Sequence, residues 1–139
     1  MKELHIFTDG GARGNPGPAA VGVVIKDSIG GTIHRFGKYI GETTNNTAEY
    51  QAIVEALTWV KQWRKVDRIR FFVDSQLIAL QLSGLYKVKK AHLQDLVFQV
   101  RALEQEIGAN ISYTAVPREQ NSEADRFVNL ALDKRGDVS

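Results

Sequence analysis

Two stretches of the sequence end on an aspartate in the same way, Phe7-Thr8-Asp9 and Phe72-Val73-Asp74. In a β-strand, an aromatic residue and the acid two positions later lie on the same face of the sheet. If the two strands are parallel neighbours, about 4.8 Å apart, the aspartates lie side by side and repel unless a proton or a cation lies between them. The pair therefore indicates a cation site. The structural alternatives are a turn residue for Asp9 and a helix N-cap for Asp74.

Two further acids stand near the starts of predicted helices. Glu49 shares a helix side with Ile53, so its carboxylate leans toward the buried face. Asp125 projects from the start of the last helix toward whatever that helix covers. The alternative for both is a capping box, in Asn46-Thr47-Ala48-Glu49 and in Ser122-Glu123-Ala124-Asp125. A shared cation site explains all four acids at once, whereas the structural alternatives must hold separately for each.

The residue types available limit which metal these acids could hold. The sequence has no cysteine, and its three histidines, at positions 5, 34 and 92, lack the spacing of a zinc site. An all-oxygen site suits Mg²⁺ or Mn²⁺, which are commonly shared with substrate phosphates. Two such ions can activate a water and stabilise the leaving oxygen in an in-line displacement at phosphorus.

Changes in hydrophobic period divide the chain into the elements that must position these acids. The predicted strands are Leu4–Asp9, Ala19–Lys26, Thr32–Ile40, Arg68–Asp74 and Asn110–Val116. The predicted helices are 44–63, Ser75–Leu82, Ala91–Ile107 and Ser122–Lys134. The segment Gly10–Pro18 is rich in Gly and Pro and is expected to be a turn. This order predicts an α/β fold in which helices flank a mixed five-stranded sheet.

Length and composition are those of a globular protein. At 139 residues, with 43% hydrophobic and 24% charged residues, we expect one domain spanning residues 1–139. The absence of cysteine, of a signal peptide and of a membrane-length apolar run predicts a cytoplasmic protein that does not bind membranes. We also expect a monomer. The net charge of +2 is too small for nucleic-acid binding by bulk charge alone, and two basic clusters are interpreted as solvated surface: Lys61, Arg64, Lys65, Arg68 and Arg70, and Lys87, Lys89 and Lys90.

Four segments of this sequence resemble the signature segments of type 1 ribonuclease H, in the same order: TDGGARGNPGPAAVGVVI, TNNTAEYQAIVEAL, VDSQ and VPREQNSEAD. The resemblance implies the ribonuclease H-like fold, with sheet order 3-2-1-4-5. It implies endonucleolytic hydrolysis of the RNA strand of RNA–DNA hybrids by two metal ions, leaving 5′-phosphate and 3′-hydroxyl ends. The metal-binding acids would be Asp9, Glu49, Asp74 and Asp125, with Asp9 shared between two Mg²⁺ or Mn²⁺ ions.

Substrate contacts are also predicted. Gly10, Gly11 and Gly14 remove side chains where backbone amides could approach a sugar–phosphate, and Asn15 offers a donor and an acceptor beside them. The alternative is a plain Gly/Pro turn. By resemblance, other residues of the groove would contact 2′-hydroxyls and the DNA backbone: Arg13, Thr44, Asn45, Asn46, Gln76 and Asn121.

The sequence departs from the family pattern in two places. Many bacterial members carry a basic, tryptophan-containing protrusion where this chain has only LSGLYKVKKAHLQDL, so it resembles the compact archaeal members, some of which also cleave double-stranded RNA. Trp59 and Trp63 lie instead at the end of the first long helix, where we expect them to pack on the core.

Where common members have a histidine before the last acid, this chain has Arg118, which stays protonated and cannot relay a proton. We expect Arg118 to contact the scissile phosphate or a metal ligand. The alternative is a surface arginine paired with Glu119 or Glu123.

Three other functions stay open. Another nuclease of the same fold would cut junctions or DNA ends rather than hybrids, although the TNNTAEY segment argues against it. A binding module that kept the fold without catalysis would retain hybrid but not cleave it. A nucleotide-binding loop is the weakest alternative, because GARGNPG matches neither GxGxxG nor a Walker sequence.

Overall fold

One five-stranded sheet organises residues 2–63 and 65–139, which are the residues that this computed structural model describes. Its strands are β1 (Glu3–Ala12), β2 (Gly17–Asp27), β3 (Thr32–Thr43), β4 (Arg68–Val73) and β5 (Asn110–Ala115). β2 lies antiparallel between β1 and β3, whereas β4 runs parallel to both β1 and β5. The order β3-β2-β1-β4-β5 confirms the predicted mixed sheet.

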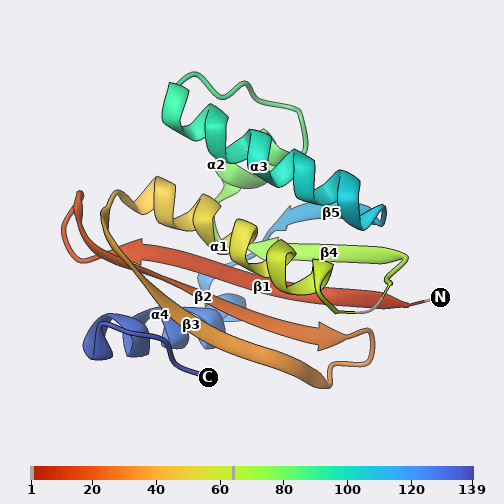
Figure 1. Cartoon of the computed structure of the whole chain (residues 1–139), viewed down its shortest axis with the longest axis horizontal. Coiled ribbons are helices and arrows are strands. Elements are labelled where there is room, and N and C mark those ends of the chain that lie inside the picture. The colour runs from red at the N-terminus through yellow and green to blue at the C-terminus, as the bar shows by residue number, and fades with distance from the viewer. Residues whose placement is uncertain (1, 64) are drawn as a thin grey trace.

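Helices cover the two faces of the sheet unequally. In the described part of the chain they are α1 (Asn45–Lys61), α2 (Gln76–Leu82), α3 (Ala91–Ile107) and α4 (Ser122–Lys134), the last preceded by a short 3₁₀ helix, η1 (Arg118–Asn121). Figure 1 shows α1, α2 and α3 on one side of the sheet and α4 on the other. None of these helices is long and apolar enough to cross a membrane. The four predicted helices are confirmed, but η1 was not predicted.

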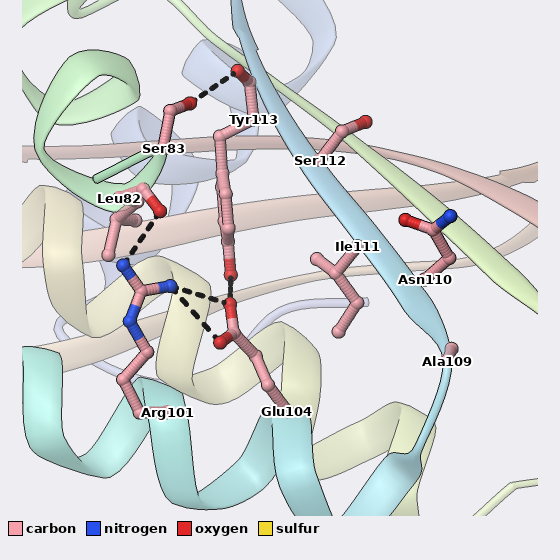
Figure 2. A pocket seen from close by; sticks show the side chains of 9 residues that line it. All are labelled: Leu82, Ser83, Arg101, Glu104, Ala109, Asn110, Ile111, Ser112 and Tyr113. Atoms are coloured by element: carbon pink, nitrogen blue, oxygen red, sulfur yellow. Dashed lines mark hydrogen bonds and ion pairs between the residues drawn. The ribbon is translucent and has the colours of Figure 1, made fainter. Parts of the chain in front are cut away.

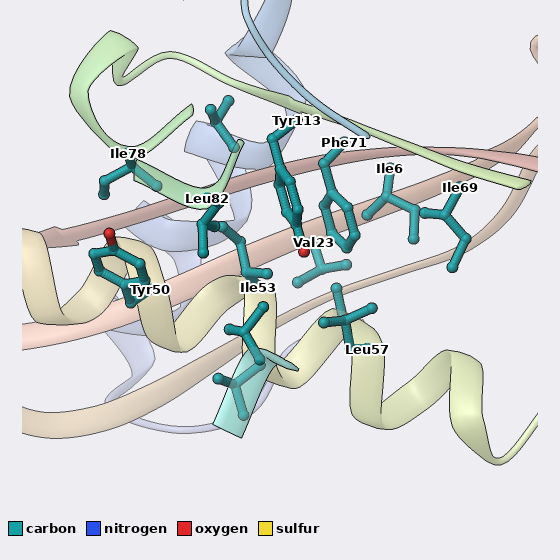
Figure 3. Close-up of a cluster of buried hydrophobic side chains, with 14 of the residues drawn as sticks. Ile6, Val23, Tyr50, Ile53, Leu57, Ile69, Phe71, Ile78, Leu82 and Tyr113 are labelled. Carbon is teal, nitrogen blue, oxygen red and sulfur yellow. The ribbon is translucent and has the colours of Figure 1, made fainter. Parts of the chain in front are cut away.

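The main hydrophobic core lies between the sheet and α1, α2 and α3. Figure 3 shows Tyr50, Ile53 and Leu57 of α1 within the same cluster as Ile6 of β1 and Phe71 of β4. Burying each such side chain stabilises the fold by about 1.5–3 kcal/mol. Smaller apolar clusters pack beneath α4 on the opposite face. Asp9 lies within β1 and Asp74 directly follows β4. Both strands are interior strands of the sheet, each paired with a neighbour on either side.

The open edge of the sheet is braced by a polar network between α2, α3 and β5 (Figure 2). Arg101 donates to the Leu82 carbonyl at 2.7 Å and to both carboxylate oxygens of Glu104 at 3.1 Å. The Tyr113 hydroxyl donates to Glu104 at 2.6 Å. Burial, together with Glu104, raises the pKa of Tyr113 well above its usual range. A hollow of about 480 Å³ lies beside this network, and the polar groups of the network that line it already hydrogen bond to one another and to the Leu82 carbonyl.

The predicted turn at Gly10–Pro18 was too long. Strand β1 continues to Ala12 and β2 begins at Gly17, with Gly10 to Ala12 pairing with Val21 to Ala19. The strand continues because these residues keep pairing with β2, and the glycine at position 10 fits a close approach of α1. A Cβ atom on Gly10 would lie 2.2 Å from the Ala48 carbonyl carbon, so only glycine lets the strand pass beneath the helix. The glycines here extend the strand instead of ending it.

The two tryptophans pack as expected. Trp59 stacks on His34, with ring centroids 4.9 Å apart, and on Trp63 at 5.5 Å. Both indoles are partly buried against the main core. The prediction that they serve packing is confirmed.

The first basic cluster is partly used in surface ion pairs. Lys61 pairs with Glu106 at 2.8 Å, and Arg70 with Glu3 at 3.5 Å. Arg64 of this cluster lies outside the described residues. The lysines of the second cluster, at positions 87, 89 and 90, are exposed, in agreement with a solvated loop.

Candidate metal and nucleic-acid site

Three of the four acids meet where β4 ends beside the second half of β1. Phe7 and Phe72 are directly paired in the parallel register, which places Asp9 and Asp74 side by side as predicted. The approach of α1 at Gly10 brings Glu49 of its first turns to the same point. Asp9, Glu49 and Asp74 each offer a carboxylate oxygen within 4.8 Å of the others. The strand pairing and one helix contact therefore build an all-oxygen cluster.

The structural alternatives for these acids do not hold. Asp9 lies within β1, not in a turn. The N-cap of α1 is Thr44, whose hydroxyl accepts from the Thr47 amide at 3.2 Å, and the N-cap of α2 is Ser75, which accepts from the Ile78 amide at 3.2 Å. Glu49 and Asp74 are thus not needed to cap their helices.

The alternative capping box before Asp125 is also absent. The N-cap of α4 is Asn121, and its side chain makes no capping hydrogen bond. Asp125 is therefore not part of a capping box, and its remaining structural role is the favourable interaction of a first-turn carboxylate with the helix dipole.

Crowding of the carboxylates shifts their proton affinity strongly. Burial, followed by the charge of Asp74 and a hydrogen bond with Asp125, raises the pKa of Asp9 to about 8. Burial and the Asp74 charge raise the pKa of Glu49 to about 7, although a hydrogen bond with Ser75 and the charge of Arg118 oppose the rise. Without a bound metal, Asp9 and Glu49 therefore keep protons at a pH at which the same acids in water would be ionised. This behaviour is expected of a site suited to a cation.

The fourth acid lies at the rim. Asp125 is exposed in the first turn of α4 and is not one of the three acids within 4.8 Å of one another. It still influences the cluster, because it hydrogen bonds with Asp9. The structure thus brings all four predicted acids to one place but gives them unequal exposure.

Arg118 projects from η1 beside the acids. Its Nε lies 4.0 Å from Asp74 Oδ2, and its side chain is 87% exposed. Glu123, one of the two partners expected if Arg118 were only a surface residue, pairs instead with Lys26 at 3.8 Å and Arg35 at 3.1 Å. The guanidinium is therefore available above the carboxylates.

A groove of about 400 Å³ runs past the acids. Besides the four acids and Arg118, it is lined by Gly10, Gly11, Ala12, Arg13 and Asn45, and by Val128, Asn129 and Leu132 of α4. Four of the residues predicted to bind substrate, namely Gly10, Gly11, Arg13 and Asn45, thus lie in one groove with the predicted metal ligands.

Other predicted substrate residues lie beside the groove. Among the described residues, Asn15, Thr44, Asn46, Gln76 and Asn121 do not line it. The Asn15 side chain accepts from the Asn45 amide at 3.0 Å, and the Asn45 side chain accepts from the Ala12 amide at 2.8 Å, so the two asparagines brace the β1–β2 turn against α1. Asn46 and Gln76 are exposed near the starts of their helices.

Asn121 lies beneath the site. Asn121 is only 1% exposed, and its Nδ2 donates to the Thr8 carbonyl at 2.8 Å. This bond ties the start of α4 to the strand immediately before Asp9. The position suits a residue that holds two acids in place, since it is closed to a substrate in this structure.

Comparison with known proteins agrees with this geometry. A family model described as reverse transcriptase-like matches residues 7–131. LC11-RNase H1, isolated from compost by a metagenomic approach and solved in complex with an RNA/DNA hybrid, is 44% identical, with a TM-score of 0.91 over 95% of this chain and 98% of its own. RNase H1 from Halobacterium salinarum is 39% identical, with a TM-score of 0.89 and coverage of 95% and 98%.

The chain belongs to the type 1 ribonuclease H family.

Curated relatives of this family extend beyond the matched region. Ribonuclease HI of Halobacterium salinarum is 42% identical over 131 residues, which are 94% of this chain but 64% of the relative. A bifunctional protein of Mycobacterium tuberculosis is 39% identical over 132 residues, which are 36% of its length. The chain therefore spans less than two-thirds of the length of these two relatives.

Two residues of this ribonuclease H site were not predicted. Ser75 hydrogen bonds with Glu49, and Asn129 hydrogen bonds with Asp125. The spacing of Asn129, four residues after Asp125 on a helix, could have indicated that contact. No local pattern links Ser75 to Glu49, because the two lie on different helices that only the sheet brings together.

Proposed function

We propose that residues 1–139 act as one ribonuclease H domain, which hydrolyses the RNA strand of RNA–DNA hybrids with the help of divalent metal ions. The observation that carries this proposal is the set of three carboxylates within 4.8 Å at the floor of a groove. It is supported by the likeness to LC11-RNase H1, whose structure was solved with an RNA/DNA hybrid.

The donor set fits a hard divalent cation. Asp9, Glu49 and Asp74 would hold Mg²⁺ or Mn²⁺, and Asp125 would add a ligand from the rim, since carboxylate oxygens are the preferred ligands of these ions. Two such ions, if bound, would supply an activated water and stabilise the leaving oxygen in an in-line displacement. The raised pKa of Asp9, about 8, supports the fit, because a cation would offset both the desolvation caused by burial and the repulsion from Asp74.

The rest of the chain would orient the substrate. Gly11, Arg13 and Asn45 line the groove, where backbone amides and polar side chains can contact sugars and phosphates without reading the bases. Thr44 and Asn46 flank Asn45 in the chain, and Gln76 follows Asp74 by two residues. Because Asn45 and Asp74 line the groove, these three residues would contact the flanks of a hybrid. Recognition of 2′-hydroxyls in the A-like minor groove would separate hybrid from duplex DNA.

Arg118 would act on charge and not on protons. Its Nε lies 4.0 Å from Asp74, so the guanidinium can stabilise the charge that develops on phosphate oxygens. Because arginine stays protonated, it cannot replace a histidine as a proton relay. Ser75 would fix Glu49, and Asn121 would fix the strand before Asp9.

The products would carry 5′-phosphate and 3′-hydroxyl ends. Additional cleavage of double-stranded RNA, a monomeric state and a cytoplasmic location stay predictions. The first rests on the resemblance to compact family members, and the last on the lack of cysteine in the sequence.

A gel assay tests the proposal. RNA labelled at its 5′ end and annealed to DNA is incubated with the protein in Mg²⁺, with and without EDTA, beside duplex DNA and a four-way DNA junction. We expect internal cuts in the RNA that EDTA abolishes, and intact DNA substrates. Cleavage of the junction with intact hybrid would assign the chain to another nuclease activity, and retention of hybrid without any cleavage would make it a binding module.

A further inference from the structure

The fourth acid is the least constrained by burial. Asp125 is exposed in the first turn of α4, whereas Asp9 is only 9% exposed between strands. An exposed carboxylate samples several side-chain rotamers, and fixing one of them when a metal binds costs conformational entropy. A neighbour that holds the carboxylate in advance would lower that cost.

Asn129 is placed to do this. It lies one turn after Asp125 on α4, and its Nδ2 donates to the Asp125 backbone carbonyl at 3.1 Å and to carboxylate Oδ2 at 3.4 Å. The same side chain lines the groove together with Asp125. One amide group therefore reaches both the backbone and the carboxylate of the acid.

The other end of the Asn129 amide connects to the glycine-rich turn. Asn129 Oδ1 accepts from Arg13 Nη2 at 3.4 Å, and the same Nη2 lies 2.7 Å from Asp133 Oδ1, one further turn along α4. Arg13 comes directly after β1, the strand that carries Asp9. A continuous set of contacts thus joins the segment after β1 to the Asp125 carboxylate.

We propose that Asn129 is a positioning residue that directs the Asp125 carboxylate toward the metal site, with Arg13 and Asp133 holding the Asn129 side chain in turn. This inference rests on the proposed function. The chemistry of the amide suits the role: it donates a hydrogen bond without neutralising the carboxylate. A lysine at this position would pair with Asp125 and compete with the cation, and an acid would repel it.

Metal binding without substrate provides the test. Mn²⁺ is titrated into the protein and free Mn²⁺ is followed by electron paramagnetic resonance, for wild type, Asn129→Ala, Asp125→Asn and the double variant. We expect Asn129→Ala to weaken Mn²⁺ binding about tenfold, as is typical for the loss of a partner of a metal ligand. In the Asp125→Asn background the same change should have no further effect, because Asn129 acts through Asp125.

Two controls separate positioning from general damage. Asn129→Gln keeps the amide and should recover part of the affinity. Both Asn129 variants should melt close to wild type, because Asn129 is exposed on a helix. Gln105→Ala, which removes an exposed amide from α3, should leave Mn²⁺ binding unchanged.

Unchanged Mn²⁺ affinity in Asn129→Ala would overturn the inference. So would an Asn129→Ala change that lowers the Mn²⁺ affinity equally in the wild-type and the Asp125→Asn backgrounds. A wild-type protein that binds no Mn²⁺ would overturn both the inference and the proposed function. A protein that binds Mn²⁺, shows the Asn129 effect and leaves hybrid intact would overturn only the proposed function.

Discussion

Removing the charge of Asp9 should stabilise the metal-free protein while ending catalysis. Burial and the neighbouring acids raise the pKa of Asp9 from 3.8 to about 8. The folded state therefore holds the proton more tightly than the unfolded state. The stability linked to Asp9 is complete below about pH 4 and is lost progressively as the pH rises to about 8. Asp9→Asn removes this loss.

The magnitude follows from the size of the shift. Each pKa unit corresponds to about 1.4 kcal/mol, so a rise from 3.8 to about 8 sets an upper limit of roughly 6 kcal/mol at pH 8. Because Asp9 shares its protons with coupled neighbours, we expect about 2–3 kcal/mol. For a chain of this size, that is a gain in Tm of roughly 6–9 °C.

Thermal unfolding followed by circular dichroism in EDTA, from pH 5 to pH 9, measures this gain. The Tm of Asp9→Asn should exceed that of wild type, and the difference should widen between pH 5 and pH 8. Asp95→Asn, which changes an exposed acid on α3, should show no such widening. A variant that melts below wild type at pH 8, or a difference that does not depend on pH, would refute the reasoning.

Three further predictions concern Arg118, the glycines and the substrate. Arg118→Ala should lower kcat on hybrid about tenfold or more, a loss of at least about 1.4 kcal/mol of transition-state stabilisation, with unchanged Tm. Arg118→Lys should recover part of the activity, and unaltered kcat and KM in Arg118→Ala would make Arg118 a surface residue. Gly10→Ala places a Cβ 2.2 Å from the Ala48 backbone and should lower the free energy of unfolding by about 3 kcal/mol, roughly 9 °C in Tm. Gly11→Ala, with Val128 at 3.8 Å, should melt like wild type, and equal melting of the two variants would contradict the packing argument. Replacing ribonucleotides around a preferred cut site with deoxyribonucleotides should suppress cutting there on a sequencing gel, and indifference would favour a general nuclease.

Sequence periodicity was sufficient to predict the centre of the site. The alternation in Phe7-Thr8-Asp9 and Phe72-Val73-Asp74 places each acid on the face of its aromatic residue, and the parallel pairing of Phe7 with Phe72 then brings the acids together. Periodicity also gave the succession of strands and helices along the chain, whereas the spatial order of the strands in the sheet was implied by the family resemblance. These features depend on local pattern and on few possible topologies.

Features that depend on tertiary contact were not predictable. The strand through Gly10 to Ala12 has no large apolar residues, so only its pairing with β2 and the approach of α1 identify it as a strand. The true N-caps, Thr44 and Ser75, were not identified from the sequence, because several nearby polar residues could fill the same role.

The burial of Asn121 is a further feature that could not be predicted from the sequence. The family resemblance implied a contact with substrate, whereas the Asn121 amide is buried against the Thr8 carbonyl. A polar residue in a loop gives no local sign of whether it faces solvent or strand, since that depends on how the following helix docks.

The most direct test of the central claim is the location of a bound metal. Crystals soaked in Mn²⁺ and measured at the manganese absorption edge should give an anomalous difference peak among Asp9, Glu49 and Asp74, with oxygen atoms about 2.0–2.2 Å away. The peak should disappear in Asp9→Asn. A Mn²⁺ peak only at another part of the surface, or no peak among these three carboxylates, would contradict the account.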